Sequence, residues 1–217
     1  MSLLINIQLY FDSKDFNQIY NRLAEGFNRD RVLRVNLSTE LFEDNTSLLQ
    51  EGIFCSFAGV LLLHPFFRHL FNHLALVENG LFIDEAARQK AVLLLYYAAT
   101  GQTAAQDHEL VVAKTCCGMP LVEVLDARAY DLTEAEKQET QNMILAAIEQ
   151  WPIMQNTSAE GLRESFLQRE GKLIQEQNNI IFRMETSGID VLLDHLPWNL
   201  SIIKFPWLEH LIRVEWR

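Results

Sequence analysis

The start of the chain changes between two hydrophobic periods. Apolar residues occupy every second position from Leu3 to Phe11, which is typical of a strand with one buried face. From Asp12 to Phe27 they recur at helical spacing, and the alternation returns from Arg31 to Leu37. A polar segment follows. The pattern predicts a small strand, helix, strand unit over residues 1–45 and a separate domain over residues 46–217.

The second domain is predicted to be mainly helical after a short strand at Ile53 to Phe57. Apolar residues recur at helical spacing in separate runs, each bounded by Gly, Pro or a capping residue. Thr133 with Glu136 and Thr157 with Glu160 have the spacing of capping boxes, which begin helices. The predicted helices cover Val60 to Val77, Asp84 to Thr100, Asp107 to Cys117, Thr133 to Gln150, and a segment that begins at Thr157.

The last part of the chain returns to strand patterns. Two apolar runs flank Asn178 and Asn179 and predict a hairpin of Lys172 to Gln177 with Ile180 to Glu185. Beyond it, the pattern predicts a short helix and then two short strands, at Ile189 to Leu196, Leu200 to Phe205 and Leu211 to Trp216. The sequence therefore predicts a helix-rich α+β fold, with five or so short helices and small strand elements near both ends.

The composition of the chain argues against nucleic-acid binding and against association with a membrane. The chain has 217 residues, and 18 Lys and Arg against 29 Asp and Glu give a formal net charge of -11. Clustered cations bind phosphates, so this balance argues against nucleic-acid binding and against a polybasic membrane patch. The longest apolar run, Val92 to Ala99, is too short to span a bilayer. Met1 to Ile7 lacks the features of a signal peptide, so we expect a cytoplasmic protein.

The three cysteines, Cys55, Cys116 and Cys117, make an odd number, and two of them are adjacent. Adjacent cysteines rarely form a structural disulfide, which indicates a reducing compartment. Their spacing does not suit zinc. We expect all three to be small buried apolar side chains.

One group of histidines has spacing that suits a metal ion. His69 and His73 lie four residues apart on a predicted helix, and His64, Asp84 or His108 is a conceivable third ligand. Counting 100° per residue, however, places both histidines on the polar side of that helix. A solvent-facing surface is therefore the favoured interpretation, and a metal site is the alternative.

Two further groups resemble acid and base sets: Asp190 with Asp194 and His195, and Glu209 with His210. Neither has a nearby Ser or Cys in an activating context. A carboxylate beside a histidine is common on solvated helix ends. The sequence therefore does not support catalysis at either place.

Charged residues are dense between Thr157 and Gly171, where Arg163, Glu164, Arg169 and Glu170 surround apolar positions. One interpretation is a salt-bridged helix surface. The other is that Arg163 or Arg169 is partly buried and binds carboxylates or backbone carbonyls where the helix meets the hairpin.

Four tryptophans lie beside Pro or at strand ends: Trp151, Trp198, Trp207 and Trp216. The default interpretation is that they close the core. The alternative is a partner-facing patch, because Trp is a favoured interface anchor and a preceding Pro would hold Trp198 and Trp207 rigid.

Several long segments, in this order, resemble one known family. They are AGVLLLHPFFRHLF (Ala58 to Phe71), FIDEAARQKAVLLLYYAATG (Phe82 to Gly101), HELVVAKTCCGMPL (His108 to Leu121), LTEAEK (Leu132 to Lys137), WPIMQNTSAEGLRESFLQREGKL (Trp151 to Leu173) and VLLDHLPWNLSIIKFPWL (Val191 to Leu208). Together they are similar to the tape measure proteins of contractile injection systems. The segments around Gly161 to Gly171 and Leu196 to Leu208 are the most specific.

The resemblance implies a non-catalytic assembly role in a phage-tail-like particle with an inner tube, a contractile sheath and a baseplate. Such proteins help to set tube length. Tube, spike or baseplate proteins would be the partners, no cofactor is implied, and assembly would take place in the cytoplasm before incorporation into the particle. The resemblance assigns no catalytic residue. It implies a shared structural or docking core formed by Arg163, Glu164, Arg169, Glu170, Trp198 and Trp207.

A protein that sets tube length by its own extension must be long, and this chain is short. One unbroken helix of this length would span only about 330 Å, whereas a compact fold has a radius of gyration of about 17 Å. We therefore expect either a globular part of a longer tape measure protein or a short relative that docks to other components. The alternatives are a metal-dependent hydrolytic enzyme that uses the His64, His69 and His73 helix, and a generic regulatory protein-binding module.

Overall fold

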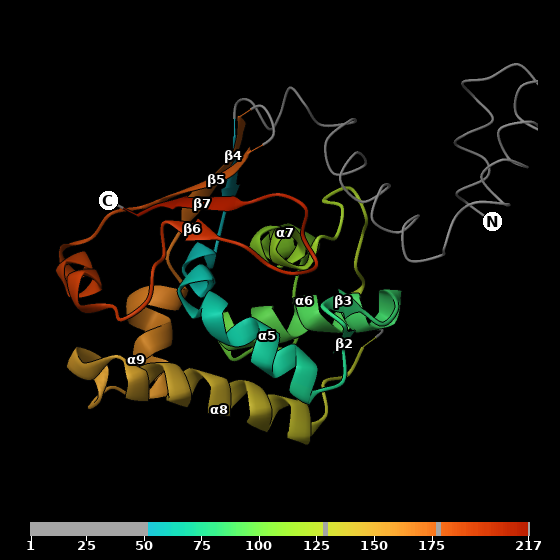
Figure 1. Ribbon diagram of the computed structural model, residues 1–217, viewed down its shortest axis with the longest axis horizontal. Coiled ribbons are helices and arrows are strands. Elements are labelled where there is room, and N and C mark those ends of the chain that lie inside the picture. Colours follow the sequence, from blue (N-terminus) through green and yellow to red (C-terminus); the bar gives the residue numbers. More distant parts are fainter. Residues whose placement is uncertain (1–51, 128–129, 177–178, 217) are drawn as a thin grey trace, which may run out of the picture. The chain divides into compact units, whose positions relative to one another are not determined.

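The computed structural model of the chain describes residues 52–127, 130–176 and 179–216 (Figure 1). The unit predicted for residues 1–45 lies outside the described residues, so the division of the chain into two domains stays a prediction. The described ranges contain both helices and strands, and helices predominate. The predicted helix-rich α+β class is confirmed.

The described elements follow one another along the chain as short helices and strands, where η denotes a 3-10 or π-helical segment. They are β1 (Ile53–Cys55), η1 (Ala58–Leu63), α5 (His64–His73), β2 (Val77–Glu78), β3 (Leu81–Phe82), α6 (Glu85–Thr100), η2 (Asp107–Leu110), α7 (Val111–Cys117), α8 (Glu134–Gln150), η4 (Pro152–Met154), α9 (Ala159–Leu162), η5 (Arg163–Leu167), β4 (Gly171–Glu176), β5 (Asn179–Met184), η6 (Gly188–His195), β6 (Ile202–Ile203) and β7 (Ile212–Glu215).

The main sheet of the described residues has the strand order β1-β4-β5-β7-β6, and β2 pairs with β3 separately. β4 and β5 form the predicted hairpin, with Leu173 opposite Phe182. Neighbouring strands run antiparallel except β5 and β7, which are parallel. A parallel pair needs a crossover connection, and the chain between β5 and β7 supplies it with η6 and β6.

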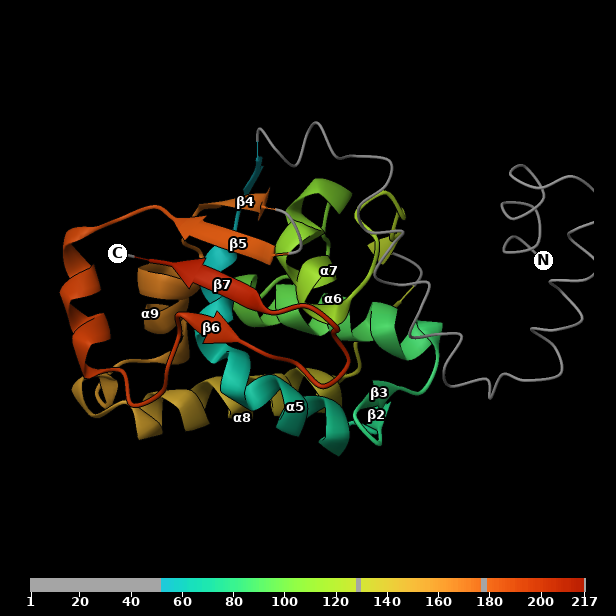
Figure 2. The same ribbon diagram turned by 45° about the horizontal axis from the view of Figure 1, so that its top comes forward.

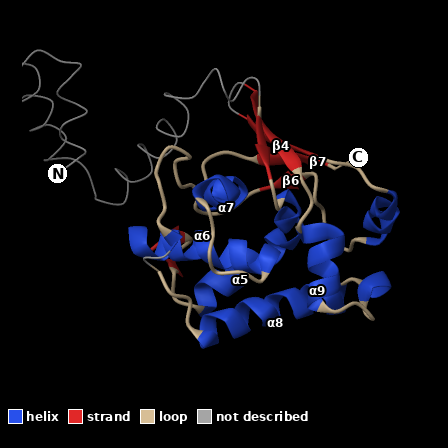
Figure 3. Ribbon diagram, turned by 180° about the vertical axis from the view of Figure 1, so that it is seen from behind, coloured by secondary structure: helices blue, strands red, loops and turns tan. Residues whose placement is uncertain are grey.

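The sheet is one layer of the fold and the helices form the other (Figures 2 and 3). Helices α5 to α8 all lie on the same side of the sheet in both views. Leu173, Phe182 and Val214 share one cross-strand row and are buried toward the helices. Because side chains alternate along a strand, the neighbouring residues Lys172 and Arg183 face the other way.

Helix α6 is the centre of the helical layer. It packs against α7, α8, η1 and η5, and its side chains are buried on several sides, as expected of a helix enclosed by others. The side chain of Asp84 caps its first turn by accepting a hydrogen bond from Ala87 N at 2.7 Å. Gly101, with φ of 70°, ends it in the left-handed conformation that favours glycine. The predicted helix from Asp84 to Thr100 is confirmed.

The predicted helix from Val60 to Val77 is wrong as a single element. A 3-10 helix, η1, precedes α5, and Pro65 lies in the first turn of α5, where its missing N–H costs nothing. All six residues of η1 are buried, which no amphipathic α-helix allows. At the other end Ala75 has a φ of 54° and turns the chain into β2.

Three smaller predictions also need correction. The helix predicted to begin at Thr157 is capped instead by Ser158, whose Oγ accepts from Gly161 N at 3.0 Å. The helix predicted from Ile189 to Leu196 is the 3-10 helix η6, and the strand predicted from Leu200 to Phe205 is reduced to the two residues of β6. The capping box of Thr133 and Glu136 does begin α8, as predicted.

Gly59 is the point where two segments far apart in the sequence, η1 and η5, touch backbone to backbone. A Cβ atom at Gly59 would lie 1.7 Å from Phe166 O, and Gly59 N donates to Arg169 O at 3.3 Å. The other segment at this crossing is η5, a π-helical turn in which Gln168 N donates to Arg163 O at 2.9 Å. No side chain fits between η1 and η5, so the crossing requires glycine.

We predict that Gly59→Ala destabilises the protein by about 3 kcal/mol, because overpacking a site enclosed by backbone forces the backbone apart. Gly188→Ala is the matched control, since nothing lies within 4 Å of a Cβ at Gly188. Urea unfolding of both variants measures the difference. Equal stability of the two variants would show that η1 and η5 separate at no cost.

Candidate functional site

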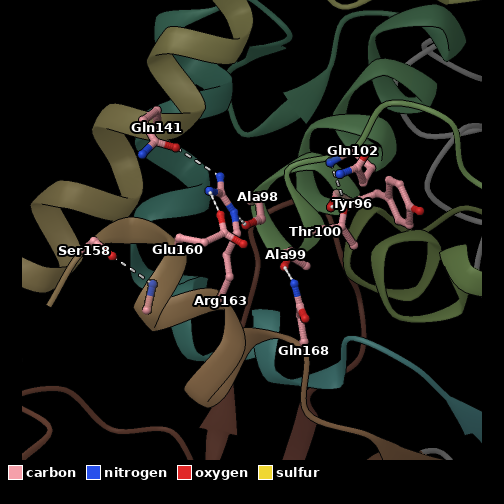
Figure 4. A network of polar contacts seen from close by, with 11 residues as sticks. Tyr96, Ala98, Ala99, Thr100, Gln102, Gln141, Ser158, Glu160, Arg163 and Gln168 are labelled. Carbon is pink, nitrogen blue, oxygen red and sulfur yellow. Dashed lines mark hydrogen bonds and ion pairs between the residues drawn. The ribbon is translucent and has the colours of Figure 1, made fainter.

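Arg163 is the centre of a buried polar network (Figure 4). It is the first residue of η5 and is 5% exposed. Its Nε donates to Ala98 O at 3.0 Å, and its Nη2 donates to Gln141 Oε1, from α8, at 3.0 Å. Its Nη1 forms an ion pair with Glu160 at 3.1 Å. One guanidinium therefore joins α6, α8 and α9.

The position of Arg163 follows from how helices end. The last carbonyls of a helix have no partner within it, and the helix dipole favours a cation there. Ala98 lies in the last turn of α6, and Arg163 satisfies its carbonyl. Gln168 Nε2 donates to the next carbonyl, Ala99 O, at 3.4 Å. The end of α6 is thus capped from η5, about seventy residues further along the chain.

Arg169 forms a second junction, between η5 and the hairpin. Its Nη2 lies 3.2 Å from Asp190 Oδ1, and both side chains are largely buried. It also donates to Ser165 O and Glu185 O, each at 3.1 Å. The other carboxylate oxygen of Asp190 accepts from Ser187 N at 2.7 Å and caps η6. Arg169 therefore holds η5, the end of β5 and the start of η6 together.

Both arginines of this charged segment are turned inward and are not part of a salt-bridged helix surface. Arg163 and Arg169 bind backbone carbonyls and carboxylates at the junction of helix and hairpin. Glu164 and Glu170 are exposed. The four residues thus separate into an inward pair that joins elements and an outward pair that is free for contact with solvent.

The two Pro-Trp corners differ in burial. Trp207 is 9% exposed, donates from Nε1 to Cys116 O at 2.8 Å, and stacks on Phe205 with ring centroids 5.1 Å apart. Trp198 is only partly buried, although its Nε1 donates to Leu62 O at 2.9 Å and its ring packs edge-on against Phe66. Trp207 lies in the core, whereas one side of Trp198 reaches the surface.

The histidine helix does not assemble a set of ligands. His69 and His73 are exposed, with ring centroids 6.4 Å apart, and His73 Nε2 lies 3.7 Å from Glu139 Oε2. His64 is turned inward, and its Nδ1 is 3.1 Å from Leu61 O. Across the described ranges, no three His, Cys, Asp or Glu side chains are grouped in a way that could hold a metal ion.

The residues of the two acid and base sets have other positions. Asp190 is bound to Arg169, and Asp194 and His195 are exposed at the end of η6. Glu209 is exposed and His210 is partly buried. The three cysteines are free and buried, and burial raises the pKa of the Cys55 thiol to about 12.

Sequence reasoning missed a buried lysine. Lys114 is 1% exposed, and its Nζ donates to Asp107 Oδ1 at 2.6 Å and to Glu123 O at 2.7 Å. The same oxygen of Asp107 accepts from Leu125 N at 2.9 Å. The pair fixes the loop after α7 to η2. A single lysine within an otherwise apolar helix was the available signal.

Each of these networks joins elements of the fold. The chain belongs to the family of contractile injection system tape measure proteins, whose family model matches residues 12–216. No curated protein and no solved structure matches the chain. None of the described helices is both long enough and apolar enough to cross a membrane.

We predict that Arg163→Met lowers the free energy of unfolding by about 3 kcal/mol, because it leaves the buried Ala98 O without its donor and removes the donor to the partly buried Gln141. In a domain of this size that corresponds to a Tm about 10 °C lower. The neighbouring exposed position supplies the control: Glu164→Gln should change stability by less than about 0.5 kcal/mol. Calorimetry measures both, and a small effect of Arg163→Met would contradict the role of this side chain in joining the helices.

A second prediction concerns pH. Burial lowers the pKa of His64 from 6.5 to about 4, so the unfolded chain takes up a proton between these values and the folded chain does not. This contribution to stability is complete above pH 6.5 and is lost as the pH falls toward about 4, by at most about 3 kcal/mol.

The measurement is urea unfolding at pH 7 and pH 4.5. His64→Gln keeps a donor for Leu61 O but does not titrate, so it should lose less stability than the wild type over this interval. His69→Gln, at an exposed position of the same helix, should follow the wild type. A parallel loss in the wild type and His64→Gln would exclude His64 as the cause.

Proposed function

We propose that residues 52–216 act as a globular docking part of a tape measure protein. It contacts tube, spike or baseplate proteins while the tube is built, and it helps to set tube length through these contacts, without catalysis. Assembly takes place in the cytoplasm, and the protein is then retained within the particle. The family assignment supports a role in a contractile injection system. The shortness of the helices and strands supports action through contacts with other proteins.

The observation behind this proposal is the shortness of the elements. The longest described helix, α8, has 17 residues and spans about 25 Å. The described chain turns back repeatedly, and its first strand, β1, pairs with β4. The number of residues in this part of the chain therefore does not set the length of the structure that it forms. A contribution to length control has to come from contacts with other proteins.

The exposed acidic residues are the best candidates for these contacts. Glu164 and Glu170 are exposed, and the residues beside them are fixed by Arg163 and Arg169. Side chains on a rigid support lose little conformational entropy on binding. Acidic side chains favour basic patches on a partner. Trp198, which is partly exposed, adds an aromatic surface, whereas the buried Trp207 supports the fold.

The test is affinity capture of the tagged full chain from cells that carry the native gene cluster, followed by mass spectrometry. We expect tube, spike or baseplate proteins in the captured fraction. Glu164→Lys with Glu170→Lys should reduce their recovery about tenfold, because charge reversal opposes a basic partner.

The control variant, Glu78→Lys with Glu149→Lys, makes the same change of charge at two exposed positions on other elements. It should recover the partners as the wild type does, and thermal unfolding should show that both variants are folded. Capture of only non-particle proteins, from a lysate in which particles assemble, would favour the regulatory module instead.

A further inference from the structure

Helix η6 has an unusual distribution of buried and exposed side chains. Its only buried residue is Asp190, whereas none of its four aliphatic residues is buried. Val191 is 60% exposed, and Ile189, Leu192 and Leu193 are partly exposed. In most helices the aliphatic side chains are buried and the carboxylates are exposed. An apolar surface left open in this way is typical of a binding site.

The way in which η6 is held explains why its aliphatic side chains are not covered. The helix lies at one edge of the described structure, between β5 and β6 along the chain (Figures 1 and 2). The ion pair of Asp190 with Arg169 fixes its start, and the short helix η4 packs against it. Ile189, Leu192 and Leu193 contact the hydrophobic core with only part of their surface. A polar contact therefore fixes η6, and much of its apolar surface stays exposed.

The exposed side of η6 has a defined shape. Residues three apart lie above one another on a 3-10 helix, and Val191 and Asp194 form such a row, in which both side chains are exposed. Leu192 and Leu193 lie in the two neighbouring rows. Ile153 of η4 is 47% exposed and extends the apolar surface onto the adjoining helix. Eight residues of 3-10 helix span about 16 Å, which is the length of about three turns of an α-helix.

The charges on the segments around η6 are mostly negative. Residues 149–170 and 185–198 contain seven acidic residues and two arginines. Both arginines already bind carboxylates, Arg163 that of Glu160 and Arg169 that of Asp190. The other five acidic residues are all exposed, and they are Glu149, Glu164, Glu170, Glu185 and Asp194.

The cations that come next along the chain do not offset these carboxylates. Lys172 Nζ lies 5.1 Å from the ring centroid of Phe54, and Arg183 forms an ion pair with Glu215 at 3.0 Å. The only other basic side chain within residues 149–170 and 185–198 is His195. The surface of η6 and η4 therefore combines exposed aliphatic side chains with an excess of carboxylates.

We propose that η6 and η4 bind a basic amphipathic helix of a partner protein. The apolar stripe of that helix covers Val191, Leu192 and Ile153, and its Lys or Arg side chains pair with the carboxylates of Asp194 and Glu149. The inference rests on the proposed function and deepens it, because it gives the chemistry of the segment that a particle protein would present.

The probe is a fluorescein-labelled synthetic helical peptide with a leucine stripe flanked by lysines. A second peptide, with glutamate in place of each lysine, tests the sign of the charge. Fluorescence anisotropy with the full chain should show binding of the basic peptide that weakens as salt is raised, and no comparable binding of the acidic one. Equal binding of both peptides would overturn the proposal.

Val191→Ser with Asp194→Asn changes the exposed row of η6 and should weaken binding of the basic peptide about tenfold. The control is Val124→Ser with Asp126→Asn, which makes the same two substitutions at exposed positions after α7 and should change affinity less than about twofold. Equal effects of the two double variants would contradict a site at η6. Thermal unfolding of both shows that a loss of binding is not a loss of fold.

A second copy of the chain is the other occupant that the experiment can detect. Self-association of the wild type that Val191→Ser with Asp194→Asn abolishes, measured by sedimentation, would assign the surface to a second copy and overturn the proposal. A monomeric wild type that binds the basic peptide supports a separate partner.

Peptide binding and the capture of particle proteins fail separately. A wild type that captures tube, spike or baseplate proteins but binds neither peptide would overturn this inference and leave the proposed function supported. A wild type that binds the basic peptide through η6 but captures no particle protein would contradict the proposed function and support the chemistry of this surface.

Discussion

The structure depends on the close crossing of η1 and η5 at Gly59. Because the backbones touch there, the segment that leads into the hairpin is held directly against the segment that follows β1. This contact positions Arg163 at the end of α6 and brings Gly171 opposite Cys55, so that the sheet and the helical layer are joined at one place. A side chain at Gly59 would separate both layers at once.

The buried cationic side chains make the same kind of contact in this fold. Arg163, Arg169 and Lys114 each bind at least one backbone carbonyl in addition to a carboxylate. Removing a charge from water is costly unless its hydrogen bonds are replaced, and backbone carbonyls at helix ends and loops supply that replacement. The three side chains connect short elements that also share one hydrophobic core. Exposed acidic residues, Glu164 and Glu170, lie directly beside two of these side chains in the sequence.

Local signals in the sequence were sufficient for much of the fold. The capping residues Asp84 and Thr133 begin α6 and α8, Gly101 ends α6, and the hairpin lies where alternation flanks two asparagines, because each of these features depends on a few neighbouring residues. The division between η1 and α5, the parallel pairing of β5 with β7 and the burial of Arg163 depend on residues far away in the sequence. The charge pattern around Arg163 did not decide between surface and interior, since a π-helical turn changes which residues point inward.

The pairing of β1 with β4 has a consequence for synthesis of the chain. Cys55 and Gly171 are separated by 116 residues, so the contact order of the sheet is high and its closure is slow compared with helix formation. At about 5–20 residues per second, a ribosome needs about 6–23 s to make the chain between them. Throughout that interval the helical segments emerge while β1 lacks its partner β4. The nascent chain therefore leaves β1 without β4 until the hairpin leaves the ribosome, and the sheet is complete only when β6 and β7 have followed.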